Sequence, residues 1–116
     1  MGIINKFTKK YLPKKGDIVF IKNKKDSHSI YTSAIVVSNN VFNNNTTMVI
    51  VCPITNNVKY HPTRYLLKET KKIDGSVMCE HIRSIDYKVN NLIFVEKATK
   101  NEIEKIIDLV NACINE

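Results

Sequence analysis

The chain lacks the features of several other protein classes. None of its hydrophobic runs approaches the ~20 residues that a membrane-spanning helix needs. We expect no signal peptide, because the start of the chain soon gives way to Lys9-Lys10 and Lys14-Lys15. At 116 residues the chain is too short for two domains, and its 43% hydrophobic and 25% charged residues are typical of a soluble globular protein. We therefore expect a cytoplasmic protein that does not contact a membrane.

Cysteine is scarce, and its spacing excludes two kinds of site. The three cysteines, Cys52, Cys79 and Cys113, lie far apart and include no Cys-x-x-Cys pair. This pattern argues against a disulfide framework and against a zinc site. Each cysteine lies among apolar residues, so we expect all three to be free and buried. The sequence therefore predicts neither a metal nor a cofactor.

Acidic residues are nearly absent from the N-terminal end. Residues 1–25 hold eight lysines and one acid, Asp17, whereas the other residues hold ten basic and ten acidic side chains. The net charge of +7 therefore lies entirely in residues 1–25. Such a block attracts polyanions through counterion release, without reading their sequence, but it also fits a tail that only adds solubility. We expect residues 1–13 to form a basic arm or a short helix that Pro13 ends, followed by one domain at 14–116.

The pattern of apolar residues predicts a mainly β fold with one helix. β-Branched and aromatic runs predict six strands, at residues 16–22, 34–37, 48–54, 64–67, 76–82 and 92–95. We expect residues 23–33 to form a long polar loop and the asparagine-rich residues 38–47 to form a turn. Apolar residues at helical spacing predict a helix over residues 100–114, with Thr99 and Glu102 as a capping box. Together these elements predict a small, curved β-barrel of about six strands with a C-terminal α-helix.

Polar residues capable of chemistry lie in two of the predicted strands. Thr55 closes the strand at 48–54, and Glu80 and His81 lie within the strand at 76–82. If these strands are neighbours, we expect the hydroxyl, the carboxylate and the imidazole to converge at one end of the sheet. Each residue also has a plain structural interpretation: Thr55 as a turn residue, and Glu80 and His81 as polar side chains that face water.

Several short motifs resemble those of MazF/PemK-type toxins, in that family's order and spacing. They lie at residues 15–20, 34–39, 42–44, 51–55, 74–75 and 83–86. The most specific part is Pro-Ile-Thr followed by Ile-Arg-Ser-Ile-Asp, and the resemblance makes residues 14–116 a single MazF/PemK-like domain. It implies an SH3-like barrel, a homodimer and metal-independent, sequence-specific cleavage of single-stranded RNA. It also implies a cognate acidic antitoxin whose tail occupies the RNA groove.

The resemblance assigns roles to individual residues. Thr55 matches a threonine that contacts the region of the scissile phosphate, and Glu80 matches an acidic residue that shares the acid–base work in some members. Arg83 matches a basic residue before Ser-Ile-Asp, and His81 stands where many members have glutamine. One position departs from the pattern. The family has an arginine central to catalysis just before its second strand, and this chain has Thr32 there.

Cleaving RNA without a metal requires a base for the 2′-hydroxyl, a positive charge for the phosphorane and an acid for the leaving oxygen. The candidate catalytic residues are Thr55, Glu80 as the base and His28 as the acid, with His81 as an alternative acid. Without an arginine at position 32, we expect a lysine of residues 22–25 or a histidine to supply the charge. The candidate RNA-binding residues, which include an aromatic ring that can stack on a base, are Tyr31, Thr32, His81, Arg83, Lys24 and Lys25.

Two other functions stay open at this point. The threonine at position 32 favours a catalytically impaired MazF-like protein that binds RNA or an antitoxin. The lysine-rich residues 1–25 favour a basic SH3-like adaptor on nucleic acid or on a larger protein. Arg83 and Asp86 are also suited to a structural ion pair in the turn that they flank.

Overall fold

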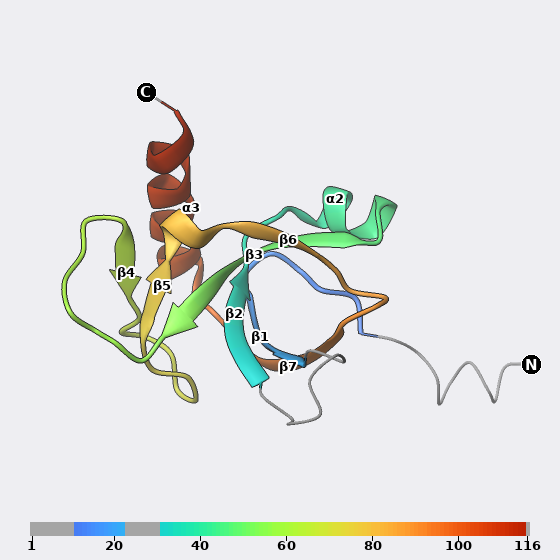
Figure 1. Ribbon diagram of the computed structural model, residues 1–116, viewed down its shortest axis with the longest axis horizontal. Coiled ribbons are helices and arrows are strands. Elements are labelled where there is room, and N and C mark those ends of the chain that lie inside the picture. Colours follow the sequence, from blue (N-terminus) through green and yellow to red (C-terminus); the bar gives the residue numbers. More distant parts are fainter. Residues whose placement is uncertain (1–10, 23–30, 116) are drawn as a thin grey trace, which may run out of the picture.

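The computed structural model describes residues 11–22 and 31–115 (Figure 1). Within this part the chain forms seven strands, one short and one long α-helix and a short 3₁₀ turn. In chain order they are β1 (Asp17–Lys22), β2 (Tyr31–Val36), α2 (Asn40–Asn45), β3 (Met48–Thr55), β4 (Arg64–Leu66), β5 (Ser76–Met78), η1 (Cys79–His81), β6 (Arg83–Asp86), β7 (Asn91–Lys97) and α3 (Lys100–Ile114). Neither described helix is long and apolar enough to cross a membrane.

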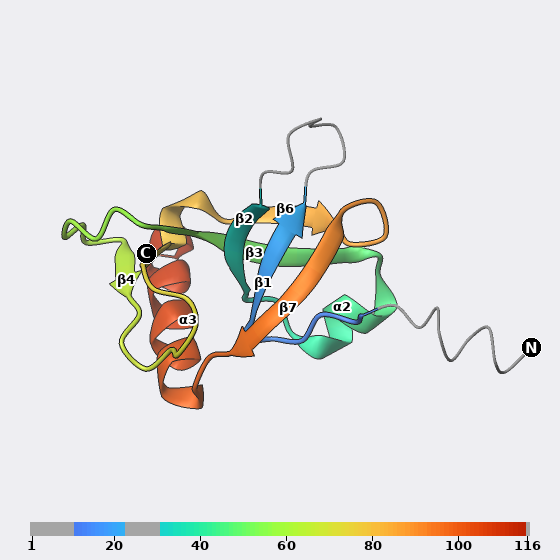
Figure 2. The same cartoon turned by 90° about the horizontal axis from the view of Figure 1, so that it is seen from below.

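All strand pairs are antiparallel, and β3 is the central strand of the sheet. The strand order is β4-β5-β3-β2-β1-β7. β6 pairs with the first half of β3, and β5 pairs with the end of β3. The strands coil strongly around one another, as Figures 1 and 2 show. The predicted fold class, a curved mainly β structure with a C-terminal helix, is therefore confirmed. In the described residues the sheet is not closed by pairing between β4 and β7.

The sheet has two apolar faces, because side chains alternate along each strand. One face packs against α3 and forms a core around Ile18, Ile35, Cys52, Ile54, Val77 and the helix residues Ile103, Ile106 and Val110. The other face buries a second cluster where the strands curl over it: Val19, Ile21, Ala34, Val36, Val49, Val51 and Ile85. The predicted helix over 100–114 is confirmed, and its apolar stripe is what covers the first face.

The start of α3 ties the helix to the loop after β4. The Thr99 side chain caps the helix by accepting a hydrogen bond from the Glu102 N–H at 3.2 Å. The Glu102 carboxylate is fully buried and accepts the backbone N–H groups of Lys68 and Glu69 at 3.0 and 3.1 Å. The predicted capping box is therefore only half formed, because this carboxylate holds the loop after β4 instead.

Replacing Glu102 with alanine is expected to lower the free energy of unfolding by about 2 kcal/mol, since two backbone donors lose a charged acceptor. Urea unfolding measures this change. Glu104→Ala is the matched control, because Glu104 is exposed on the same helix and its replacement is expected to change stability by less than about 0.5 kcal/mol. Equal effects of the two substitutions would contradict a bracing role for Glu102.

Two connections differ from their predictions. Residues 31–33 are strand rather than loop, because Tyr31 and Thr32 pair with Lys22 and Ile21 of β1. The asparagine-rich turn contains the helix α2, which Asn39 caps by accepting the Phe42 N–H at 2.8 Å. The same side chains that favour turns also favour helix N-caps, so composition did not separate the two structures.

The predicted strand at 76–82 is wrong beyond Met78. The chain leaves β5 there, passes through η1 and enters β6, so the described chain has seven strands rather than six. Glu80 and His81 therefore lie in a 3₁₀ turn and not in a strand. The prediction for the cysteines also needs one correction, because Cys113 is exposed whereas Cys52 and Cys79 are buried. Residues 1–10 of the predicted basic arm lie outside the described residues.

Candidate active site

Strand alternation places several candidate residues on the face of the sheet that faces away from α3. Ile54 and Val77 are paired and belong to the core under the helix, so their neighbours Thr55 and Ser76 lie on the opposite face. Arg64 pairs with Met78 in the same alternation and shares that face.

Thr32 and Arg83 extend this face over β2 and β6. Ala34 and Val51 belong to the apolar cluster on the face away from α3. Thr32 lies two residues before Ala34 and Arg83 pairs with Val51, so both side chains share that face. We call the surface formed by Thr32, Thr55, Arg64, Glu80 and Arg83 the open face.

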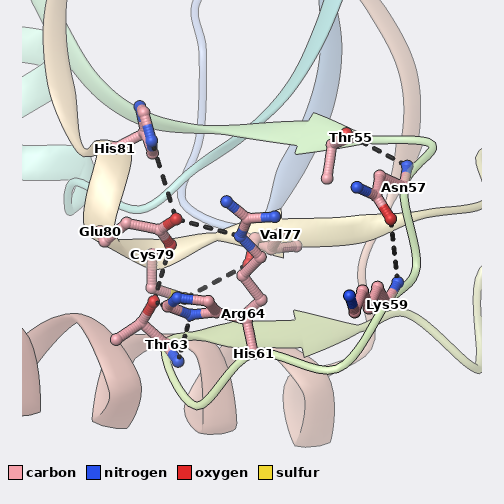
Figure 3. Close-up of polar contacts among 10 residues, drawn as sticks. All are labelled: Thr55, Asn57, Lys59, His61, Thr63, Arg64, Val77, Cys79, Glu80 and His81. Carbon is pink, nitrogen blue, oxygen red and sulfur yellow. Dashed lines mark hydrogen bonds and ion pairs between the residues drawn. The ribbon is translucent and has the colours of Figure 1, made fainter.

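Glu80 is the centre of a polar cluster on this face (Figure 3). Its Oε1 accepts the Thr63 hydroxyl at 2.9 Å, and its Oε2 accepts Arg64 Nε at 3.0 Å. His81 Nε2 lies 3.7 Å from the same Oε2, and His61 Nδ1 lies 2.8 Å from Thr63 Oγ1. One hydroxyl, one guanidinium and one imidazole thus lie around the Glu80 carboxylate, and His61 reaches it only through Thr63.

These contacts keep Glu80 ionised. Partial burial opposes its ionisation, but hydrogen bonds from its own backbone N–H, from Thr63 and from Arg64 outweigh that effect. The pKa of the Glu80 carboxyl is therefore held below its ordinary value. Glu80 is a carboxylate at neutral pH, ready to accept a proton but a weaker base than an exposed glutamate.

Replacing Glu80 with glutamine is expected to destabilise the protein at pH 7 and to have a much smaller effect at pH values below the lowered pKa of the Glu80 carboxyl. The ionised form is favoured in the folded state, so its contribution is present above the ordinary glutamate pKa of about 4.3 and is lost as the pH falls through the lowered pKa. Urea unfolding of wild type and variant at several pH values measures the difference. A difference that does not change with pH would contradict this assignment, and Glu104→Gln is the exposed control.

Thr55 does not meet Glu80 at one end of the sheet, so that prediction is wrong. In the antiparallel pairing Thr55 lies opposite Ser76, the first residue of β5, whereas Glu80 lies in η1, two residues beyond the end of that strand. The Thr55 hydroxyl oxygen accepts the Asn57 N–H at 3.2 Å, which supports its structural interpretation as a turn residue. Its hydroxyl proton stays available to a ligand. In Figure 3 the Arg64 guanidinium lies between Glu80 and Thr55.

Thr32 and Arg83 line a common cleft of about 390 Å³, together with Ile21, Ser84, Ile85, Asp86 and Asn90. Its volume lies within the range of small-ligand sites. The predicted Arg83–Asp86 ion pair does not form. Asp86 instead accepts the Lys88 N–H at 2.9 Å, and Arg83 has no ion pair with any described residue. The cleft therefore offers an exposed positive charge next to strand β2.

Tyr31 lies at the start of β2, beside Thr32. Its side chain is 45% exposed, and its ring centre lies 5.9 Å from that of Phe20 in a tilted arrangement. An exposed ring held by a second aromatic is suited to stacking on a nucleobase. His28, Lys24 and Lys25 lie outside the described residues.

Arg64 and Thr63 are not among the predicted site residues, and His61 was interpreted only as part of a loop. All three join the site because β4 pairs with β5 and so approaches η1. The available signal was the strand period, which sets Arg64 on the face opposite Tyr65, but its partner Glu80 is sixteen residues away in sequence. In the described part of the chain no group of three His, Cys, Asp or Glu side chains is arranged to hold a metal ion.

Residues 14–114 match the family of PemK-like, MazF-like toxins of type II toxin–antitoxin systems. The chain belongs to this family. The match spans the whole described sheet and helix α3, so the open face is part of a PemK/MazF-like domain.

Solved structures of MazF proteins share the fold. The MazF of a MazE–MazF complex from Deinococcus radiodurans is 21% identical, with a TM-score of 0.80 over 90% of this chain and 97% of that chain. An endoribonuclease in complex with its cognate antitoxin, from a mycobacterial species, is 19% identical, with a TM-score of 0.75 over 88% and 94%. Mycobacterium tuberculosis toxin MazF-mt6 is 14% identical, with a TM-score of 0.62 over 83% and 94%. No curated protein matches the chain.

Proposed function

We propose that this PemK/MazF family member is a sequence-specific endoribonuclease that cleaves single-stranded RNA without a metal. The observation that carries the proposal is the open face, where the half-buried Arg64–Glu80 ion pair, the Thr55 hydroxyl and the exposed Arg83 lie on one surface. A similar fold in a mycobacterial endoribonuclease supports it. The same likeness, and the complexes of MazF with MazE, support a cognate acidic antitoxin as partner.

The residues of the open face divide the chemistry among them. Glu80 accepts the proton of the attacking 2′-hydroxyl, since a carboxylate has lone pairs beyond those used by Thr63 and Arg64. Thr55 donates its hydroxyl proton to a phosphate oxygen. A protonated histidine, His28 or His81, supplies the proton to the leaving oxygen.

The RNA strand is held beside these groups. Tyr31 stacks on a base, and Thr32, His81, Arg83, Lys24 and Lys25 contact the backbone. The homodimer follows the commonest form of closed assembly, which has two-fold symmetry. Residues 14–116 act as one domain, and residues 1–13 act as a basic arm that adds affinity for phosphate.

One specific observation favours a second function. Thr32 stands at the position where the resemblance implies a catalytic arginine. The arginine that lines the cleft at Thr32 is Arg83, which comes from β6 instead. The alternative is a catalytically impaired protein that binds RNA, or an antitoxin tail, along the open face without cutting it.

Incubation of the purified protein with a long unstructured RNA in EDTA, from pH 5 to pH 9, tests the proposal. We expect defined cleavage products. Thr55→Val, purified identically, is expected to cleave at least about tenfold more slowly, whereas a contaminating nuclease would give the same products in both preparations. RNA binding without cleavage at any of these pH values would contradict the proposed activity and favour the alternative.

A further inference from the structure

Metal-free cleavage needs a fixed positive charge near the phosphate, because the phosphorane carries more negative charge than the substrate. Position 32 of the open face is a threonine, so the charge has to come from another element. The described open face has two arginines, Arg64 from β4 and Arg83 from β6. Their surroundings differ, and the difference indicates which one acts in catalysis.

Arg64 is held in place, whereas Arg83 is not. The Arg64 side chain is 22% exposed, and its Nε donates to Glu80 Oε2 at 3.0 Å. The Thr63 hydroxyl holds the other oxygen of the same carboxylate, so Arg64 binds an anchored partner. Arg83 is exposed and has no such contact among the described residues.

The hydrogen bond to Glu80 leaves the Nη donors of Arg64 able to bind a phosphate. Guanidinium has five N–H donors in a planar fork, and the described hydrogen bond of Arg64 uses the single one on Nε. The two Nη groups keep four donors, the arrangement that binds two oxygens of one phosphate. In Figure 3 the guanidinium lies on the side of Glu80 that faces Thr55.

We propose that Arg64 is the catalytic cation of this chain: it binds the scissile phosphate through its Nη groups while Glu80 fixes its orientation. This inference rests on the proposed endoribonuclease function. The phosphate then lies between Thr55 and Glu80, with the base and the cation fixed by one hydrogen-bonded unit of β4 and η1. In this chain, which has a threonine at position 32, the positive charge for the phosphate therefore comes from β4 rather than from β2.

The ion pair also has a structural interpretation, in which Arg64 only ties β4 to η1. The two roles differ in what restores activity. A structural ion pair with Glu80 is not replaced by a positive charge on β2, because Thr32 lies in the cleft with Arg83 and not against Glu80. A catalytic charge is replaced from any position that reaches the phosphate.

Single-turnover cleavage in EDTA by Arg64→Ala, Arg64→Lys and the double variant Thr32→Arg/Arg64→Ala tests the proposal. We expect Arg64→Ala to cleave about 10²–10³-fold more slowly than wild type. Arg64→Lys is expected to be intermediate, since a lysine keeps the charge but not the fork. Thr32→Arg in the Arg64→Ala background is expected to recover at least about tenfold, as is adding millimolar guanidinium to Arg64→Ala.

Controls separate this inference from folding and from the proposed function. Lys105→Ala removes a positive charge from the exposed side of α3 and is expected to cleave as wild type does. Urea unfolding shows that each variant is folded under assay conditions. Arg64→Ala that is folded and cleaves at the wild-type rate would overturn the proposal, as would a loss that neither Thr32→Arg nor guanidinium restores. A wild-type protein that does not cleave would instead refute the proposed function.

Discussion

Replacing Gly75 with alanine is expected to lower the free energy of unfolding by about 3–5 kcal/mol. It is also expected to reduce RNA cleavage by the variant molecules that are still folded. Gly75 has φ +138°, which side-chain-bearing residues rarely adopt and which costs about 1–3 kcal/mol. A Cβ there would also lie 2.5 Å from the Thr55 carbonyl oxygen and 2.9 Å from Ile54 Cγ2. The neighbouring strand would have to move, and the displaced residue would be Thr55 of the open face.

Gly16→Ala separates backbone strain from the clash. Gly16 also has a positive φ, +92°, but a Cβ there would meet nothing closer than 3.7 Å. We expect a loss of about 1–2 kcal/mol from the conformation alone, with cleavage unchanged once the protein is folded. Urea unfolding and cleavage measure both variants. Equal losses of stability would show that the contact of Gly75 with Thr55 is not what limits that position.

Replacing Glu80 with glutamine is expected to slow RNA cleavage about 10²–10⁴-fold, because glutamine keeps the shape of the side chain but cannot accept the proton. The amide can still accept hydrogen bonds from Thr63 and Arg64 through only one oxygen, so part of the orientation is lost too. Single-turnover rates on the same RNA measure the effect.

The pH dependence of the wild-type rate tests the role of Glu80 independently. Because its pKa is lowered, Glu80 is ionised throughout the range above the ordinary glutamate value, so it does not cause a fall in rate between pH 7 and pH 5. A rate that is lost between pH 7 and pH 5 would contradict Glu80 as the base.

The fold could be predicted where one strand face or one helix face is apolar. The run at β3 and the helical spacing at α3 record burial directly in the sequence. The polar start of β2 was missed because Tyr31 and Thr32 are strand only through their pairing with β1. The break between β5 and β6 was missed because the sequence does not show that residues 76–78 and 83–86 pair with different parts of β3.

The site was less predictable than the fold because it depends on pairing between distant segments. The sequence and its resemblance to the toxin family indicated Thr55, Glu80 and Arg83 as candidates, but antiparallel register separates Thr55 and Glu80 along the direction of β5. Arg64 gave no local signal of chemistry, and only the β4–β5 pair brings it to Glu80.

Cleavage of two oligonucleotides by the wild-type protein in EDTA tests the proposed endoribonuclease function most directly. One is a single-stranded RNA, and the other has the same sequence with every 2′-hydroxyl methylated. If the 2′-hydroxyl is the nucleophile, the RNA is cut to products with 2′,3′-cyclic phosphate and 5′-hydroxyl ends, and the methylated strand stays intact. Cleavage of both strands, cleavage only after Mg²⁺ is added, or two intact strands would contradict it.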